Sequence, residues 1–479
     1  MTIDDKYDLD EKEIVECVEE SRLRSNYAEL SPHQARRKFW RLYFMAMSLC
    51  IGGMYVGYAV VAPGNVVANP GFIQVDPVTG ATELDAVHVS LWSGFTIVGQ
   101  VCGMLIAPLG DHVGRKPTLW LMTALMIGAI VMEMLANDWK VFLGGKILTG
   151  VSTGLAMAAI PALCAELTMP QFSGDVMGAF ALGFSFGQLP CAVGLEVLFK
   201  TDPHEFRRIF YAQFVVVGLW LIPLFIVPES PLWLASKGHH DKGKKALRRL
   251  VGNVEGYDLD HEYAVIAAQH EASARASKHS WITLLRGHNL KRTLITCIVP
   301  TLIYCSGQPL IYGQTAYFFQ TAGLEDPFVG NLIITVLTII FVAIGNWIVL
   351  PRVPRRKATL TFLVCSVPLL SIIGGLGCLP VSRPVASGLI AVCSVWVSLF
   401  CATVAVIYWI TIGEIPTASI RQMTITFALI FMSAWGAMWT YVVPILLSPQ
   451  KADLGTKTCF VFAGVTVPFI PREYARLLS

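Results

Sequence analysis

The chain has 479 residues, of which 54% are hydrophobic and 14% charged, and its formal net charge is +3. Soluble domains carry about 25% charged residues, so this composition excludes an ordinary water-soluble fold and predicts a protein that crosses a membrane several times. The net charge is too small to indicate a nucleic-acid partner. The 12 cysteines form no C-x-x-C pair, so we expect packing residues rather than disulfides or metal ligands.

The N-terminal segment is polar and begins acidic, which is not typical of a cleavable signal peptide. We therefore expect the first apolar run to act as an uncleaved membrane signal. Most of the apolar runs are long enough for a membrane-crossing helix, which takes about 20 residues. We place them at roughly 40–62, 88–109, 117–136, 140–165, 175–198, 208–228, 293–319, 328–350, 358–380, 387–412, 423–447 and 458–470.

Because a helix satisfies its own backbone hydrogen bonds in lipid, these runs predict an all-α fold. A polar segment divides them into six and six, which predicts two six-helix bundles. The last run, Cys459 to Ile470, is too short to cross, so the twelfth helix is expected to be short or truncated. The expected units are a cytoplasmic tail, a first bundle, a cytoplasmic central loop that includes an amphipathic helix at 244–250, a second bundle and a short tail. Their bounds are 1–38, 39–228, 229–291, 292–470 and 471–479.

Lysine and arginine gather before the first run and after the second, sixth and eighth runs. Cytoplasmic loops carry an excess of these residues, so the N-terminus is expected to be cytoplasmic. Lys200, Arg207 and Arg208 run against the pattern. The basic loops after the second and eighth runs hold equivalent places in the two bundles. This weak internal repeat is typical of transporters whose halves rock about a midplane site.

Two loop motifs stand out, Gly110-Asp-His-Val-Gly-Arg-Lys116 and Pro228-Glu-Ser-Pro-Leu-Trp-Leu234. In the first, Gly114 permits a tight turn, and Asp111 and Arg115 can form charge-assisted bonds to neighbouring helix ends. An ordinary basic loop is the alternative interpretation of this motif. In the fourth run, Gly150 and Gly154 are one helical turn apart, which indicates a close helix contact.

The seventh run carries several amides and hydroxyls, among them Gln308, Tyr312 and Gln314. Polar groups inside a membrane are costly unless they are used, and amides can both donate to and accept from a polyhydroxylated ligand. Hydrogen bonds between helices are the alternative. The tenth run ends with Trp409, Glu414 and Arg421, and the tryptophan could equally be a packing residue.

The two loop motifs together resemble the sugar-porter branch of the major facilitator superfamily, over about residues 40 to 465. Gly57-Tyr58, Tyr317-Phe-Phe319 and Leu454–Phe460 are most similar to fungal α-glucoside (maltose-type) permeases. The resemblance implies the fold of that superfamily and transport by alternating access around a central cavity. It implies no enzyme activity and no cofactor or metal.

In this family the loop after the second helix acts as a conformational latch. The resemblance extends this gating role to a set of residues expected at the cytoplasmic side, namely Asp111, Gly114, Arg115, Lys146, Glu166, Glu229, Arg355, Arg356, Glu414 and Arg421. Ser173 stands where the family has an arginine, so Glu166 is expected to lose a partner.

The resemblance also assigns substrate contacts. Gln188 matches a substrate glutamine of the family, and Trp409 falls where sugar porters stack an aromatic ring on the sugar. Three places that hold sugar-reading amides in the family are Ile303, Tyr304 and Pro309 here. Proton-coupled relatives have an aspartate where this chain has Ala59, so symport through this position is not expected. Apart from Glu133, Glu166 and Glu196 near the ends of the runs, no carboxylate is expected deep in the first bundle.

We therefore expect a transporter, monomeric and embedded in the lipid bilayer of the plasma membrane, that moves a small molecule. A hexose or α-glucoside is placed slightly ahead of other small metabolites. The expected substrate-binding residues are Gln188, Gln308, Tyr312, Gln314 and Trp409. Efflux of a fungal secondary metabolite is one alternative, and a non-transporting sensor or decayed relative is another.

Overall fold

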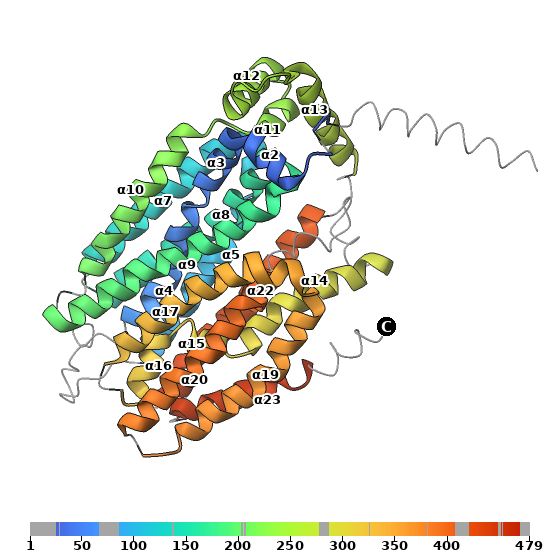
Figure 1. The fold of residues 1–479 in the computed structure, drawn as a ribbon. Coiled ribbons are helices and arrows are strands. Elements are labelled where there is room, and N and C mark those ends of the chain that lie inside the picture. The colour runs from blue at the N-terminus through green and yellow to red at the C-terminus, as the bar shows by residue number, and fades with distance from the viewer. Residues whose placement is uncertain are drawn as a thin grey trace, which may run out of the picture.

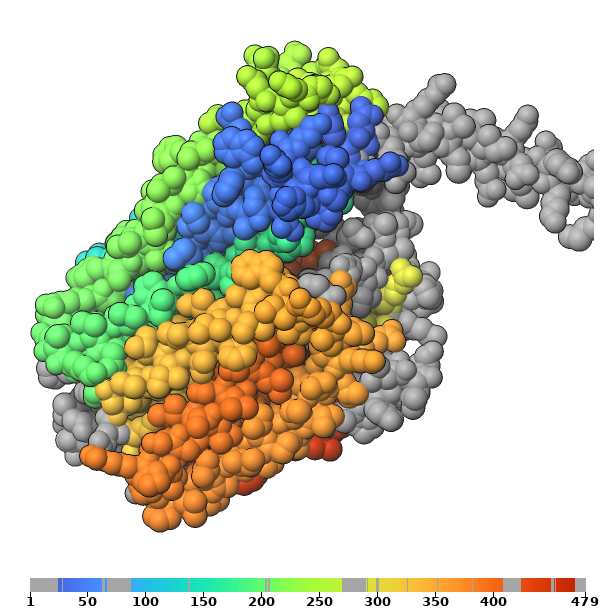
Figure 2. All heavy atoms as spheres, viewed as in Figure 1, coloured from blue at the N-terminus to red at the C-terminus, as the bar shows by residue number. Residues whose placement is uncertain are grey.

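A computed structural model describes residues 25–27, 29–66, 86–136, 138–202, 205, 207–276, 287–324, 326–380, 382–407, 421–448, 452 and 454–469. Every regular element in these ranges is a helix, and ten helices are long and apolar enough to cross a membrane. The prediction of an all-α polytopic protein is confirmed. The helices form two elongated halves that lie side by side (Figures 1 and 2). Buried apolar residues fall largely into two clusters, one for each half.

The first half begins with a short amphipathic turn of helix and continues with six spans. Its elements are α2 (Pro32–Lys38), α3 (Trp40–Leu49), α4 (Gly52–Val66), α5 (Ala86–Ile106), α6 (Leu109–Val113), α7 (Arg115–Leu135), α8 (Trp139–Leu167), α9 (Pro170–Thr201) and α10 (Arg208–Ile226). A Cβ added at Gly150 or Gly154 of α8 would lie 2.0 Å from a backbone oxygen of α5. The predicted close helix contact at these two glycines is confirmed.

The second half is more broken than the first. Its elements are α14 (Gly287–Cys305), α15 (Gln308–Ile311), α16 (Thr315–Thr321), α17 (Pro327–Ile344), η4 (Gly345–Val349), α18 (Leu350–Arg352), α19 (Arg355–Leu376), α20 (Arg383–Ala402), α22 (Arg421–Leu447), η6 (Gly455–Lys457) and α23 (Thr458–Thr466). The prediction of one continuous span over 293–319 is wrong, because three helices occupy it. Gly307 adopts a left-handed φ of 97°, and Pro309 cannot donate a backbone hydrogen bond, so the helix ends there.

The central segment covers one end of the first half with α11 (Pro231–Ser236), α12 (His240–Val251) and α13 (Leu259–Ala276), as Figure 1 shows. Helix α12 buries Leu247 and Leu250 while its lysines remain largely exposed, which confirms the predicted amphipathic surface helix. The chain before α2 is held against α13, because Ser25 Oγ donates to Glu262 Oε2 over 2.7 Å and Tyr27 stacks on Tyr257.

Candidate functional site

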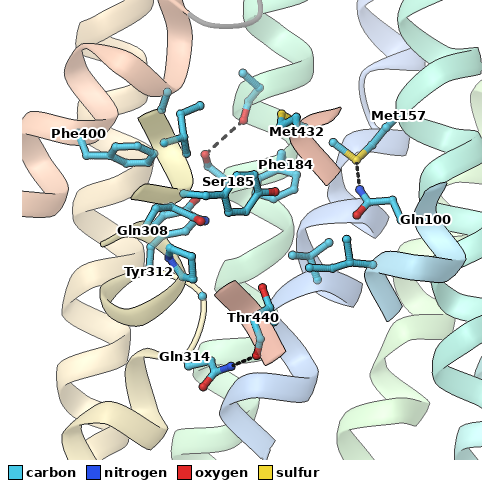
Figure 3. Close-up of a pocket in the computed structure, with 18 of the residues that line it drawn as sticks. Gln100, Met157, Phe184, Ser185, Gln308, Tyr312, Gln314, Phe400, Met432 and Thr440 are labelled. Atoms are coloured by element: carbon cyan, nitrogen blue, oxygen red, sulfur yellow. Dashed lines mark hydrogen bonds between the residues drawn. The ribbon is translucent and has the colours of Figure 1, made fainter. Parts of the chain in front are cut away.

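A cavity of about 170 Å³ lies between the two halves (Figure 3). Among its described lining residues no side chain is charged. The polar groups are three glutamines and several hydroxyls, and the apolar walls carry aromatic rings and thioethers. The polar lining side chains are Ser93, Thr96, Gln100, Ser185, Tyr304, Gln308, Tyr312, Gln314 and Thr440. The large apolar ones are Met157, Phe180, Phe184, Phe400 and Met432.

The break in the seventh span places three of the predicted residues at this cavity. Gln308 begins α15 directly after the left-handed Gly307, Tyr312 ends that helix, and Gln314 is the N-cap residue of α16. All three line the cavity, and Figure 3 shows them on one wall. In a continuous helix Gln308 and Tyr312 would share a face, because they are four residues apart, but Gln314 would point away from it. The break is what brings Gln314 to the same wall.

Gln188 lies behind this wall rather than in it. Its side chain is buried in α9, and its Nε2 donates to Tyr312 Oη over 2.8 Å. It is absent from the cavity lining, so in this arrangement it fixes the tyrosine. Trp409 lies outside the described residues.

Two amide oxygens at the cavity are open acceptors. The Oε1 atoms of Gln308 and Gln314 are buried and have no hydrogen-bond partner among the described residues. Gln314 Nε2 is 3.5 Å from the carbonyl oxygen of Thr440 (Figure 3). An unpaired buried acceptor costs about 1–3 kcal/mol, so both atoms favour an occupant that donates hydrogen bonds.

Sequence reasoning missed Gln100 and the aromatic and thioether side chains of the first half. Gln100 sits in the middle of α5 with its Nε2 against the sulfur of Met157, and Phe184 lines the cavity from α9. A lone amide in the middle of an apolar span was the available signal for Gln100. Ile303, Tyr304 and Pro309 also line the cavity, so the three places that lack the family's amides do face the solute space.

The residues of the first half that were predicted to form a latch lie in one cluster, at the end covered by the central segment. Arg115 pairs with Asp111 at 2.7 Å, and its Nε donates to Glu166 Oε1 over 2.9 Å. Glu166 Oε2 is buried without a partner among the described residues, as expected where Ser173 replaces an arginine. The predicted set of Asp111, Arg115 and Glu166 is therefore brought together.

Glu229 from the second loop motif completes this cluster. Its carboxylate accepts from the backbone N–H groups of Arg115 and Lys116 at 3.0 to 3.2 Å, at the first turn of α7. A carboxylate at a helix N-terminus is stabilised by the unpaired N–H groups and by the helix dipole. Trp233 Nε1 donates to the carbonyl oxygen of Asp111, so both loop motifs form one structure.

Gly114 joins α6 to α7 with a φ of 122°, and a Cβ there would lie 2.9 Å from Glu229 Oε2. We expect Gly114→Ala to lower the free energy of unfolding by about 2 kcal/mol, because it adds backbone strain and displaces the carboxylate. Thermal unfolding of the purified protein measures the loss. Gly238→Ala is the matched control, since its φ is 72° with open space around it. An equal loss in both variants would contradict a role for the carboxylate contact.

The corresponding residues of the second half can be placed only in part. Arg355 and Arg356 begin α19 and are exposed. Glu414 lies outside the described residues. Arg421 begins α22, but its side chain is not among those described. Their expected latch role therefore stays a prediction.

Lys146 does not belong to the latch cluster, which corrects the expected grouping. Residues 146 and 166 are 20 positions apart in α8, about 30 Å along the axis, so Lys146 lies near the other end of the helix. Its Nζ is 3.0 Å from Glu133 Oε1, and both side chains are at most 1% exposed. Glu133 lies near the end of α7, as expected, and is buried there against Lys146 of α8.

Two bundles of spanning helices enclose a cavity lined by uncharged hydrogen-bonding groups. This arrangement defines a membrane solute transporter rather than an enzyme. The sequence profile described as "Sugar (and other) transporter" matches residues 45–476, so the chain belongs to this family of major facilitator transporters.

Curated relatives and solved structures agree with this assignment. The MFS transporter fmqE of Aspergillus fumigatus is 27% identical over 96% of this chain and 88% of its own length. The facilitated trehalose transporter Tret1 of Culex quinquefasciatus is 25% identical over 88% of this chain and 80% of its own. The probable glucose transporter rco-3 of Neurospora crassa is 24% identical over 89% of this chain and 75% of its own length. The E. coli xylose transporter XylE, in a partially occluded inward-open conformation, matches with a TM-score of 0.75 and 14% identity, covering 91% of this chain and 97% of that one, which shows the fold.

Proposed function

We propose that this protein moves a neutral small molecule by alternating access through the cavity, and that this solute is less hydroxylated than a hexose. The observation that carries the proposal is the cavity wall itself. Gln308 and Gln314 offer open acceptors, while Phe180, Phe184 and Met432 offer apolar surface. Such a wall favours a solute with an apolar or aromatic body and a few N–H or O–H donors.

Contacts between the halves support alternating access. At the end away from α11–α13, Asn65 Oδ1 of α4 accepts from the backbone N–H of Ala316 over 3.0 Å, and Phe199 packs on Phe328 with ring centroids 5.1 Å apart. These contacts join the halves at one end of the cavity. Opening them while closing the opposite end would expose the cavity to the other side of the membrane.

We further propose that transport is not coupled to protons through the first span. Ala59 is buried in α4, and no carboxylate is among the described residues that line the cavity. Glu133 is the most deeply buried carboxylate among the described residues of this half, and it pairs with Lys146 outside the cavity lining. The proposal includes a cytoplasmic N-terminus and a plasma-membrane location, which the basic residues beside α3 and the family favour.

A sugar is the second candidate solute. The relatives Tret1 and rco-3 are named as a trehalose transporter and a probable glucose transporter. Gln100, Gln308 and Gln314 with neighbouring hydroxyls could also bind sugar hydroxyl groups. We rank a sugar second because the family's sugar-reading amides are absent at Ile303, Tyr304 and Pro309.

Ligand-dependent thermal stabilisation of the purified full-length protein tests the proposal, because binding to the folded state raises stability. We expect a tryptophan-containing cyclic dipeptide to stabilise the protein more than glucose or maltose at equal concentration. Gln314→Leu should remove this stabilisation, whereas Gln320→Leu, a half-buried glutamine outside the cavity lining, should not. In proteoliposomes, uptake of the stabilising solute should be unchanged by an uncoupler.

Each other outcome has a defined meaning. Stronger stabilisation by maltose or glucose would establish the second candidate. Solute accumulation driven by a proton gradient and abolished by an uncoupler would contradict uncoupled transport. Stabilisation that survives Gln314→Leu would exclude this cavity as the binding site.

A further inference from the structure

A second hollow lies on the surface, where the start of α3 meets the turn after α12. It is a groove of about 690 Å³, lined by Arg37, Lys38, Trp40, Arg41, Val251, Gly252, Asn253, Val254 and Glu255. The dark-blue atoms of α2 and α3 lie directly beside the yellow-green atoms of the central segment in Figure 2. The transport cavity does not include any of these residues.

Three cations face this groove without an ion-pair partner in the described part of the chain. Arg37 and Arg41 are exposed, and Lys38 Nζ lies 4.6 Å over the ring of Tyr27. Neighbouring Arg36 differs, because it pairs with Asp175 at 2.8 Å. The groove thus holds three positive charges against the single carboxylate of Glu255.

The turn after α12 is shaped to receive Arg41. Gly252 has a left-handed φ of 75°, and a Cβ there would lie 3.1 Å from Arg41 Cδ. A Cβ at this position would crowd the arginine side chain, so the glycine lets Arg41 pack closely against the turn.

Exposed aromatic rings adjoin the cations on the side toward the spans. Trp40 and Phe44 are 60% and 62% exposed, and their rings meet edge to face at 6.2 Å. Trp40, Arg41 and Phe44 have the spacing of one face of α3, and Arg37 precedes them near the end of α2. A basic end above an aromatic pair is the arrangement expected where a helix passes from headgroups into acyl chains.

We propose that this groove binds the headgroup of an anionic glycerophospholipid of the surrounding leaflet. Arg37 and Arg41 hold the phosphate, and Trp40 and Phe44 contact the upper part of the acyl chains. Charge complementarity and the adjoining aromatic pair favour a lipid over a soluble anion. The cytoplasmic leaflet is the anionic one, so the site also fits the proposed orientation.

Binding of dioctanoyl phosphatidylserine to the purified full-length protein in neutral detergent tests the proposal. We expect saturable binding, read from the shift of the thermal unfolding midpoint, with dioctanoyl phosphatidylcholine binding at least tenfold more weakly. Arg37→Gln with Arg41→Gln should weaken phosphatidylserine binding about tenfold or more, since each basic residue contributes about 1 kcal/mol near an anionic headgroup. Glu255→Gln should strengthen it.

Lys242→Gln with Lys245→Gln is the matched control, because it removes the same charge from exposed positions of α12 outside the groove. This pair should leave the affinity within about twofold. Equal losses in the two double variants would show diffuse attraction and overturn the site. Trp40→Ala should weaken phosphatidylserine binding but not binding of glycerophosphoserine or inorganic phosphate. If those soluble anions bind as tightly as the lipid, the lipid assignment is wrong.

None of these measurements uses a transported solute. A negative result therefore removes the lipid site and leaves the proposed transport untouched, and the reverse also holds.

Discussion

Replacing Lys146 by methionine should destabilise the protein by about 3–5 kcal/mol, because the change leaves Glu133 as an uncompensated charge inside the first half. Glu133 has its partners on two other helices. Its Oε1 lies 3.0 Å from Lys146 Nζ and accepts from Thr149 over 2.5 Å, and its Oε2 is 3.4 Å from Gln213 Nε2. The lysine ammonium in turn lies about 5 Å from the ring centres of Phe142 and Phe210.

A double variant separates the pair from its surroundings. Lys146→Met combined with Glu133→Gln should recover most of the lost stability, because no buried charge then remains. Thermal unfolding of the four proteins in detergent gives the coupling free energy. Lys140→Met, at an exposed position of the same helix, should change stability by less than about 0.5 kcal/mol. An unchanged midpoint for Lys146→Met alone would show that the charge pair does not exist in the folded protein.

Replacing Glu229 by alanine should lower the free energy of unfolding by about 2–3 kcal/mol, because hydrogen bonds to a charged group are lost at the start of α7. The carboxylate accepts from the backbone N–H groups of Arg115, Lys116 and Ser230. Solute flux in proteoliposomes should fall more steeply than stability alone predicts, since the same contact joins the two loop motifs of the predicted latch.

Glu229→Gln distinguishes charge from hydrogen bonding, because the amide oxygen can still accept from the helix end. We expect Glu229→Gln to lower the free energy of unfolding by roughly half as much as Glu229→Ala does. Glu205→Ala is the control, since this exposed carboxylate pairs, among the described residues, with Arg208 at the opposite end of the first half. Flux that is normal in Glu229→Ala, measured where the variant remains folded, would remove the latch role.

The sequence indicated the loop cluster of the first half and three cavity residues because each depends on local spacing. Asp111, Gly114 and Arg115 lie within one turn, and Gln308, Tyr312 and Gln314 are close neighbours in the chain. Their mutual arrangement was harder to foresee. The run is apolar on both sides of Gly307, so its sequence does not distinguish a glycine inside a helix from a glycine that ends one. The break at Gly307 was therefore not predicted.

The position of Lys146 shows a different limit. Motif similarity placed it with Glu166, although counting helical rise along α8 separates the two by about 30 Å. Its actual partner, Glu133, is on α7, and no spacing rule relates positions on two antiparallel helices without their register. Gln188 was found by its match to a substrate glutamine of the family, but that match could not show that it supports Tyr312 rather than lining the cavity.

The contrast between the two halves bears on how the carrier moves. The first half has continuous α8 and α9. Glycines of α8 pack on α5, and a buried charge pair joins α8 to α7. In the second half, α14 to α16 are separate pieces and α17 ends in the π-helical turn η4. The first half is thus suited to remain rigid. The helix breaks in the second half allow the cavity wall beside Gln314 to move without a rotation of the whole bundle. Solute release would then begin with a local bend at Gly307, and probes attached to α16 should move earlier than probes attached to α8.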